Sequence, residues 1–265
     1  MPKDAVNLVT DIIHGILMKV HAKLPERYKV YAKRCYAIFA EPYRKIVANA
    51  KFAFVRPSMG KIENINLFEQ RIYSQNGEDG IIKIIFYKIG TTNKFCVEFG
   101  VGDGTECNTR YLIENCGWNF LHMDCGDNLP KTIKKEFVSA ENINSLFKKY
   151  NVPKEFDLLS IDIDNNDYWI WKSLSEYSPR VVIIEYNSLF PATEAKVIKY
   201  EPITKPNSPY IGASLLALEK MGKSKGYTLL ARDNSGVNAF FIRNDLIKDH
   251  FAIKRIEDIH SGPHT

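Results

Sequence analysis

One nine-residue run restricts the fold of this chain more than any other feature: CVEFGVGDG, at residues 96–104. Its apolar first half is interrupted by Glu98, and glycines follow at alternate positions: Gly100, Gly102 and Gly104. An apolar run bounded by glycines is typical of a buried strand that leads into a tight turn. Glycine adopts positive φ and has no side chain, so such a turn can hold a ligand against bare backbone. The run therefore predicts a cofactor-binding turn after a parallel strand.

From about residue 67, short apolar runs alternate with helical segments, which is the pattern of an α/β domain built on a parallel sheet. We expect strands at 95–99, 119–124, 137–142 (the weakest), 157–162, 180–186, 227–232 and 237–243. We expect helices at 75–90, 105–116, 166–177 and 212–225. A turn-forming stretch at 233–236 joins the last two strands as a hairpin, so these two run antiparallel.

Length and composition fit one such domain with an appendage. The chain has 265 residues, of which 45% are hydrophobic and 25% charged, and these values are ordinary for a globular protein. The first residues lack the layout of a secretory signal, and no apolar run reaches the roughly 18 residues of a spanning helix. We expect a cytoplasmic protein with an N-terminal extension at 1–66 and the main domain at 67–265.

The extension at 1–66 is basic and has the spacing of helices. Residues 1–62 hold 12 Lys or Arg against 4 Asp or Glu, whereas the whole chain has a net charge of only +5. Three roles are open: a helical cap on the main domain, a homodimer contact, or peripheral contact with an anionic surface such as the inner membrane. Packing on the protein itself is favoured, because apolar helical stripes usually face a core. No nucleic-acid motif accompanies the basic residues, so we expect no nucleic-acid partner.

Cysteine and histidine carry no site prediction. The cysteines are odd in number and lack CxxC spacing, which favours buried free thiols over disulfides or zinc ligands. They are Cys35, Cys96, Cys107, Cys116 and Cys125. His122 lies inside a predicted strand and is expected to be a packed core residue.

Acidic side chains gather where the predicted strands end. The strand-end residues are Glu98, Asp124, Asp162 with Asp164, and Glu185 with Asn187. Ligands of open α/β sheets bind beyond the carboxyl ends of the strands, so all of these are site candidates. An acid after a strand can also cap the next helix, which is the role we favour for Asn166 and Asp167. Shared polarity at four strand ends still predicts a ligand site at this edge.

The glycine spacing favours one class of cofactor. A dinucleotide fold requires G-x-G-x-x-G with pyrophosphate on a helix N-terminus, whereas this chain has G-x-G-x-G in acidic surroundings. S-adenosylmethionine suits such surroundings better, because it carries a sulfonium cation and no phosphate. Asp124, 20 residues after Gly104, is placed to accept the ribose hydroxyls, as the acid after the second strand does in Rossmann-like sites.

Several strings resemble the class I S-adenosylmethionine-dependent methyltransferases, over roughly residues 73–244. They are YSQNGEDGI, FCVEFGVGDGTECNTRYL, DLLSIDIDNNDYWIWKSL, RVVIIEYNS and GVNAFFIR. They look most like bacterial FkbM-type and related sugar methyltransferases of capsule and O-antigen synthesis. The resemblance implies a Rossmann-like sheet of seven mostly parallel strands with the last one antiparallel. The family often has glycine where this chain has Asn165.

The resemblance also implies a cofactor-binding set. Glu98, Gly100, Gly102 and Gly104 would line the methionine end of the cofactor, with Asp124 at the ribose and Asn142 at the adenine. Gln75, Glu78 and Asp79 would close over the methionine carboxylate and amine. Asp162 is also expected to contact the cofactor.

The catalytic residues are expected at the next two strand ends. Metal-dependent relatives such as catechol O-methyltransferase hold Mg2+ with an acid after the fourth strand and an acid–asparagine pair after the fifth. Here Asp162 (or Asp164), Glu185 and Asn187 would take these places, although Tyr186 separates the last two. Oxygen ligands favour Mg2+, Mn2+ or Ca2+ over zinc. Asp164 or Asp167 would remove the proton, and Asp162 could instead serve as a base without an ion.

We therefore expect an O-methyltransferase that acts on a hydroxyl of a nucleotide-activated sugar or glycan precursor. Two alternatives stay open: N- or carboxyl methylation of a small molecule, and a scaffold that retains the cofactor fold without turnover. In the main interpretation Tyr168 and Trp169 could stack on a sugar. The long loop at 190–210, with Tyr200 and Tyr210, would be a substrate lid.

Overall fold

A computed structural model describes residues 60–202 and 212–260 of the chain. The chain divides into two compact units, Met1–Met59 and Gly60–Thr265. The predicted helices of the N-terminal extension lie outside the described residues. Ile62 and Ile65, which the sequence pattern placed in the extension, are buried in the second unit. Ile62 pairs there with Phe251 in an isolated β-bridge.

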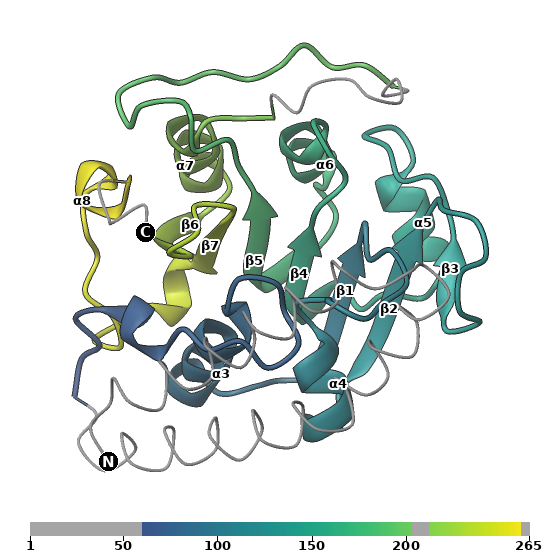
Figure 1. Ribbon diagram of the computed structural model, residues 1–265, viewed down its shortest axis with the longest axis horizontal. Coiled ribbons are helices and arrows are strands. Elements are labelled where there is room, and N and C mark those ends of the chain that lie inside the picture. Colours follow the sequence, from purple (N-terminus) through teal and green to yellow (C-terminus); the bar gives the residue numbers. More distant parts are fainter. Residues whose placement is uncertain (1–59, 203–211, 261–265) are drawn as a thin grey trace, which may run out of the picture. The chain divides into compact units, whose positions relative to one another are not determined.

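The second unit is built on one seven-stranded sheet in the order β3-β2-β1-β4-β5-β7-β6 (Figure 1). Strand β7 is antiparallel to both of its neighbours, and the other pairs are parallel. The strands are β1 (Phe95–Phe99), β2 (Asn119–Asp124), β3 (Ile133–Lys135), β4 (Glu155–Ile161), β5 (Ser178–Glu185), β6 (Tyr227–Arg232) and β7 (Asn238–Arg243). This confirms the predicted Rossmann-like fold class. The strand order reverses between β1 and β4, where open α/β sheets have their ligand crevice.

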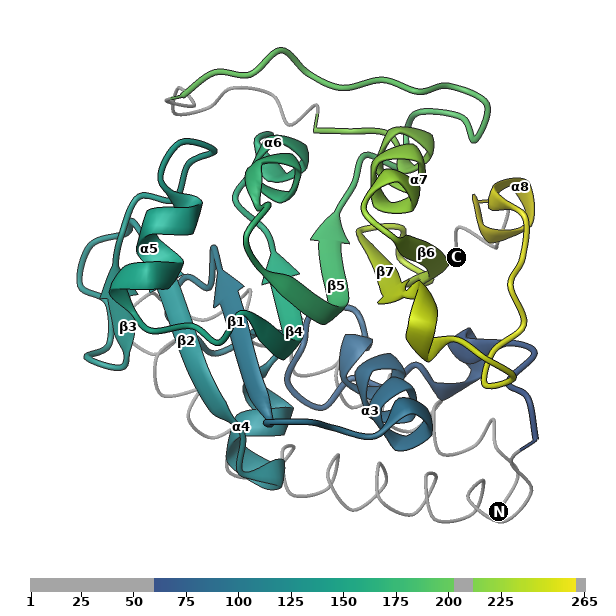
Figure 2. The ribbon, with the colours of Figure 1, turned by 180° about the vertical axis from the view of Figure 1, so that it is seen from behind.

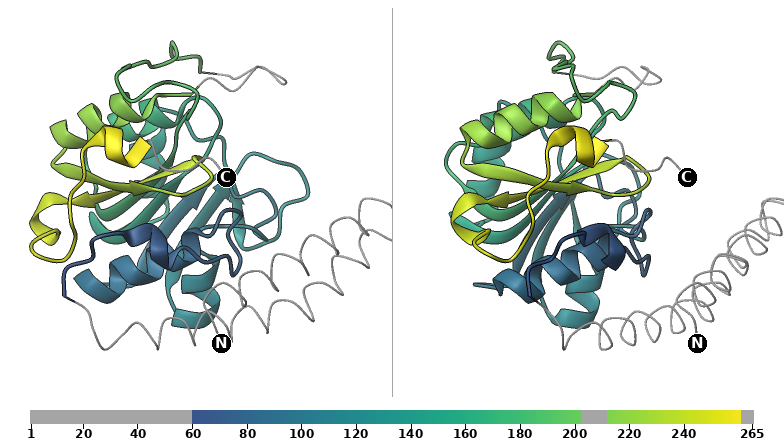
Figure 3. Two further views of the ribbon diagram at one scale, coloured as in Figure 1. Left: turned by 60° about the vertical axis from the view of Figure 1, so that its left-hand side comes forward. Right: turned by 90° about the vertical axis from the view of Figure 1, so that its left-hand side faces the viewer.

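Helices cover both faces of the sheet (Figures 2 and 3). One face carries α3 (Glu78–Ile89) and α4 (Arg110–Cys116). The other carries α5 (Ile143–Lys149), α6 (Asp167–Ser173) and α7 (Leu215–Ser224). Short elements complete the unit: the 3-10 helices η2 (Ile65–Phe68) and η3 (Asn244–Leu246), and α8 (Ile256–His260). Each face of the sheet is thus shielded from water, which explains why the strands read as nearly continuous apolar runs.

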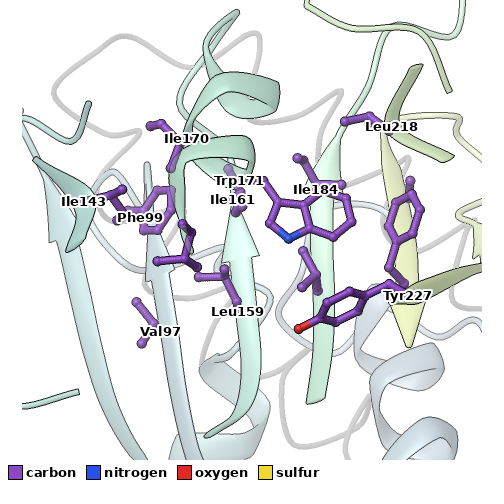
Figure 4. Packing of buried hydrophobic residues seen from close by; sticks show 14 of the residues in the cluster. Val97, Phe99, Ile143, Leu159, Ile161, Ile170, Trp171, Ile184, Leu218 and Tyr227 are labelled. Carbon is purple, nitrogen blue, oxygen red and sulfur yellow. The ribbon is translucent and has the colours of Figure 1, made fainter. Parts of the chain in front are cut away.

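Side chains alternate strictly between the two faces of the central strands. Val97, Phe99, Leu159, Ile161 and Ile184 all point toward α5, α6 and α7 (Figure 4). They pack there around Trp171, whose ring lies 4.8 Å from that of Phe241. The intervening residues of each strand must then point toward α3 and α4. Several of those residues are polar.

Three predicted elements are displaced in the structure. The predicted strand at 137–142 is wrong, because β3 lies earlier, at Ile133–Lys135. Residues 137–142 form a turn in which Asn142 accepts from the Ser139 N–H at 2.8 Å and donates to the Phe137 carbonyl at 2.7 Å. The helices expected from 75 and 105 begin later, at Glu78 and Arg110. In the turn at 137–142 and ahead of both helices, a side chain that accepts from nearby backbone N–H groups replaces regular structure.

A buried ion pair joins β4 and β5 at the amino ends of the strands. Asp157 is fully buried and lies 2.6 Å from the Arg180 guanidinium. Asp157 also accepts N–H bonds from residues 92–94. Arg180 donates to the carbonyls of Ile89 and Gly90. Both charges are therefore fully hydrogen-bonded, and together they fix the connection from α3 to β1.

The cysteines in the described part of the chain are free thiols: Cys96 and Cys107 are buried, Cys116 is half-buried and Cys125 is exposed. Cys35 lies outside the described residues. Within 60–202 and 212–260, no helix is both long and apolar enough to cross a bilayer.

Candidate cofactor and catalytic site

The strand register places five positions in one row across the sheet, four of which are candidates from the sequence. Glu98 pairs with His122 on β2 and with Ser160 on β4, so the residues two places further along these strands also lie side by side. Bonds from Gly100 N–H to the Met123 carbonyl and from Asp162 N–H to the Phe99 carbonyl continue the ladder to that point. On the far side, Glu185 pairs with Asn238 of β7. We call Asp124, Gly100, Asp162, Glu185 and Asn238 the edge row.

The glycine turn crosses this row between β1 and β4. Gly100, at φ 77°, lies against the backbone of Asp162, where an added Cβ would be 1.4 Å from the carbonyl oxygen. Gly102, at φ 54°, faces open space, and its N–H donates to Asp124 at 2.8 Å. Gly104 also has positive φ, at 80°. Gly100 is therefore required for the approach of two strands, whereas Gly102 leaves backbone accessible to a ligand.

Asp124 is half-buried at the end of β2. Its second oxygen accepts from the Gly126 N–H at 2.7 Å. The structure thus brings Asp124 to the glycine turn, as predicted for a ribose-binding acid. Asn142, predicted at the adenine, is the N-cap residue of α5 and uses its amide for the 137–142 turn.

Glu98 is turned inward, with only 4% of its surface exposed. One oxygen accepts from the Asn108 N–H at 2.9 Å, and the other accepts from the Thr109 N–H at 3.0 Å. These N–H groups precede the first turn of α4. A protein carboxylate therefore occupies the place where a dinucleotide fold binds pyrophosphate.

Asp162 and Glu185 form a carboxyl pair. They are neighbours in the edge row, and their carboxyl groups interact directly. Burial and the neighbouring Asp164 raise the pKa of Asp162 to about 6. Burial and the charge of Asp162 raise the pKa of Glu185 to about 9. Glu185 Oε2 is buried and has no hydrogen-bond partner.

Asp167 adds a third acid from the start of α6. It is 2% exposed, and its Oδ1 accepts from the Ile163 N–H at 2.9 Å. Its Oδ2 is buried without a hydrogen-bond partner. Burial, followed by the charge of Asp162, raises the pKa of Asp167 to about 7. Asn166 holds the predicted N-cap position, but neither residue caps the helix with its side chain. Asn166 donates instead to the Glu201 carbonyl at 2.7 Å.

The loop between β4 and α6 turns through two left-handed residues. Asp164 has φ 57° and is exposed, and Asn165 has φ 71°. Asn165 accepts from the Gly212 N–H at 3.2 Å. Asparagine tolerates this conformation better than most residues, which explains how it can stand where the resembled family has glycine.

Asn187 does not share the environment predicted for it. β5 ends at Glu185, so the rule that alternate residues face the same side no longer applies at Asn187. Its Oδ1 accepts from the Leu189 N–H at 2.9 Å. The structure thus brings Asp162 and Glu185 together as predicted for a cation site, but commits the Asn187 oxygen to a local turn.

Within the described residues, a group of at least three His, Cys, Asp or Glu ligand atoms within 4.8 Å of one another occurs at Glu98, Cys107 and His122. This group is unsuited to a metal. Both Glu98 oxygens already accept hydrogen bonds. Burial raises the pKa of the Cys107 thiol, which then stays protonated.

The residues around the start of α3 are divided between the surface and the interior. Gln75 is exposed, 3.5 Å from Glu106. Glu78 is 1% exposed and accepts from the Asn238 amide at 2.8 Å, so it contacts the edge row from α3. Asp79 accepts N–H bonds from residues 72–74, and its other oxygen is buried without a partner. Burial raises the pKa of Asp79 to about 6.

The described part of the predicted lid is anchored over α6 (Figure 1). The Trp169 indole donates to the Ile198 carbonyl at 2.9 Å. The Tyr200 hydroxyl donates to Glu141 at 2.5 Å, in the turn that precedes α5. This segment therefore connects the end of β5 with the predicted adenine side. Tyr210 lies outside the described residues.

Comparison of the sequence with models of known protein families finds no match, and comparison with curated proteins finds none.

Proposed function

We propose that this protein is an S-adenosylmethionine-dependent O-methyltransferase of a nucleotide-activated sugar or glycan precursor. The observation that carries the proposal is the uncompensated acidity of the edge row. Among the described residues, no Lys, Arg or His forms an ion pair with Asp162, Glu185 or Asp167. A carboxylate removed from water is stabilised by a positive partner or else takes up a proton. S-adenosylmethionine supplies a sulfonium and an ammonium, whereas a phosphate-bearing cofactor would add negative charge.

The glycine turn supports the same class of cofactor. Gly102 presents open backbone beside Asp124, which suits a ribose diol. The N–H groups before α4 are occupied by Glu98, so the usual pyrophosphate position is closed. Both features favour a nucleoside without phosphates at this turn.

Asp167 and the acids of the edge row also provide the chemistry. The acceptor oxygen would attack the methyl carbon as the carbon–sulfur bond breaks, which leaves neutral S-adenosylhomocysteine and releases the hydroxyl proton. Asp167 is suited to take that proton, because its pKa of about 7 lies near neutral pH. Asp162 and the exposed Asp164 are the other candidate bases.

A divalent cation is a second element of the proposal. The buried unpartnered oxygens of Glu185 and Asp167 fit Mg2+ or Mn2+, and Asp162 and Glu185 would hold the ion. Bound there, it would lower the pKa of the acceptor hydroxyl. The proposal includes a cytoplasmic location, with the basic extension available for a homodimer or membrane contact.

Calorimetry with S-adenosylhomocysteine and release of this product from a panel of sugar nucleotides and glycan precursors test the proposal. We expect binding by the wild type and loss of turnover in Asp162→Asn and Asp167→Asn. An exposed variant of matched chemistry, Asp249→Asn, should retain both. Absence of S-adenosylhomocysteine binding would refute the cofactor assignment. Binding without release from any acceptor would favour a scaffold, and full activity after chelation and dialysis would exclude the metal.

A further inference from the structure

A second polar row lies directly beneath the edge row. His122, Glu98 and Ser160 are neighbours in the register of β2, β1 and β4, and each is buried. Each also stands two residues before a member of the edge row, namely Asp124, Gly100 and Asp162. Residues two apart on a strand share a face. We call His122, Glu98 and Ser160 the support row.

Thr109 connects this row to the chain that follows the glycine turn. Its hydroxyl lies 2.5 Å from Glu98 Oε2 and 2.8 Å from His122 Nε2. A carboxylate can only accept, so the Thr109 hydroxyl donates to Glu98 and must accept from His122. This order requires an Nε2–H on His122. Burial lowers the pKa of His122, which favours the neutral ring, and the contact with Thr109 then assigns its proton to Nε2.

Ser160 closes the network on the β4 side. Its hydroxyl donates to Glu98 Oε1 at 3.2 Å and accepts from the Asn108 side-chain amide at 3.1 Å. One buried carboxylate thus ties three strands to the two residues that follow the turn. Each end of the glycine turn is held: Gly100 by β2 and β4, and residues 108–109 by the support row.

We propose that Thr109 is a positioning residue of the cofactor site. Together with His122 and Ser160, it fixes the position of the glycine turn relative to Asp124 and Asp162. The effect on the turn follows from the hydrogen bonds alone, whereas the effect on cofactor binding rests on the proposed function. A shift of about 1 Å in such a site can change function by roughly 100-fold. Ordinary core packing would require no hydroxyl at position 109.

Thr109→Val in the full chain removes the hydroxyl at nearly constant volume, and Thr109→Ser restores it. Thr228→Val is the control, because Thr228 lies on β6, away from the site, and its hydroxyl donates to Asn244 in η3. Amide hydrogen exchange of residues 100–109 reports on the turn without ligand. Calorimetry with S-adenosylhomocysteine reports on the site, and urea unfolding identifies conditions in which every variant is folded.

We expect Thr109→Val to accelerate exchange at 100–109 and to raise the Kd for S-adenosylhomocysteine roughly 10-fold or more, with recovery in Thr109→Ser. Ser160→Ala should act in the same direction more weakly, and it replaces Thr109→Val if that variant does not fold. Unchanged exchange, or faster exchange with unchanged binding, would overturn the positioning role. If the wild type binds no S-adenosylhomocysteine, the proposed function fails, and exchange alone then decides whether the support row holds the turn.

Discussion

Strands β4 and β5 carry charged residues at both of their ends, and the two ends are treated in opposite ways. At the amino end, Asp157 faces Arg180 at 2.6 Å. Five residues further along each strand, Asp162 faces Glu185. The first pair joins opposite charges, and the second joins two acids. The amino-end pair is buried and the carboxyl-end pair is half-buried, and the two pairs also differ in the partner that each acid is given.

The first arrangement stabilises the fold, whereas the second reduces stability when its acids ionise. The amino-end pair is satisfied by the protein itself, with bonds to backbone from residues 92–94 and to the carbonyls of Ile89 and Gly90. The carboxyl-end pair leaves a Glu185 oxygen without a partner. Buried acids without a cation favour protonation and oppose folding as they ionise. A site for a cationic ligand requires carboxyl oxygens of this kind, which the protein itself leaves without a partner.

The largest effect is expected at the amino end. Arg180→Met leaves Asp157 buried without its cation, and we expect a loss of about 3–5 kcal/mol in the free energy of unfolding. Urea unfolding at pH 7 measures this loss. Arg180→Lys should lose less, because it keeps the charge but cannot reproduce the forked contacts to both carbonyls. A cost below about 1 kcal/mol for Arg180→Met would show that backbone N–H groups alone suffice for Asp157.

The fold was predictable because apolar runs and glycine turns are local signals. The sheet, its antiparallel hairpin and the acidic carboxyl edge all follow from them. The three-residue β3 was misplaced because Asn142 binds the backbone at Phe137 and Ser139. Hydrophobic periodicity cannot report a contact of that kind.

Much of the site was less predictable because it depends on register. Ser160 and Asn238 are uncharged polar residues in largely apolar strands, and they become candidates only once their neighbours across the sheet are known. Thr109 and His122 are linked through a hydroxyl that no spacing rule identifies. Asn187 was assigned to the face of Glu185 on the assumption that β5 continued, but the strand ends first.

At the carboxyl end, the stability that the pair contributes should change with pH in the opposite direction to that of an ordinary ion pair. Folding raises the pKa of Asp162 to about 6 and that of Glu185 to about 9. Their stabilising contribution is therefore complete below about pH 4, near the unfolded pKa values, and is lost as pH rises through the folded values. Without ligand, we expect wild-type stability to fall between pH 5 and pH 9.

Glu185→Gln should flatten this dependence and add about 2 kcal/mol at pH 9, because a neutral amide replaces the acid that must ionise. Urea midpoints at pH 5, 7 and 9 measure it. Glu176→Gln, at an exposed ion pair with Lys154, is the matched control and should retain the wild-type slope. Equal slopes in Glu185→Gln and the wild type would mean that the carboxyl pair is not the source.

The smallest expected effect separates the contribution of burial from that of charge at the amino end of the sheet. Glu155 begins β4 and lies 2.5 Å from the Arg243 guanidinium, yet its side chain is 52% exposed. Water and salt screen such a pair, and Arg243 keeps Asp245 as a second partner. We expect Glu155→Gln to cost less than about 1 kcal/mol in urea unfolding, and still less in high salt. A loss comparable with that of Arg180→Met would show that opposite charge alone, without burial, stabilises this end of the sheet.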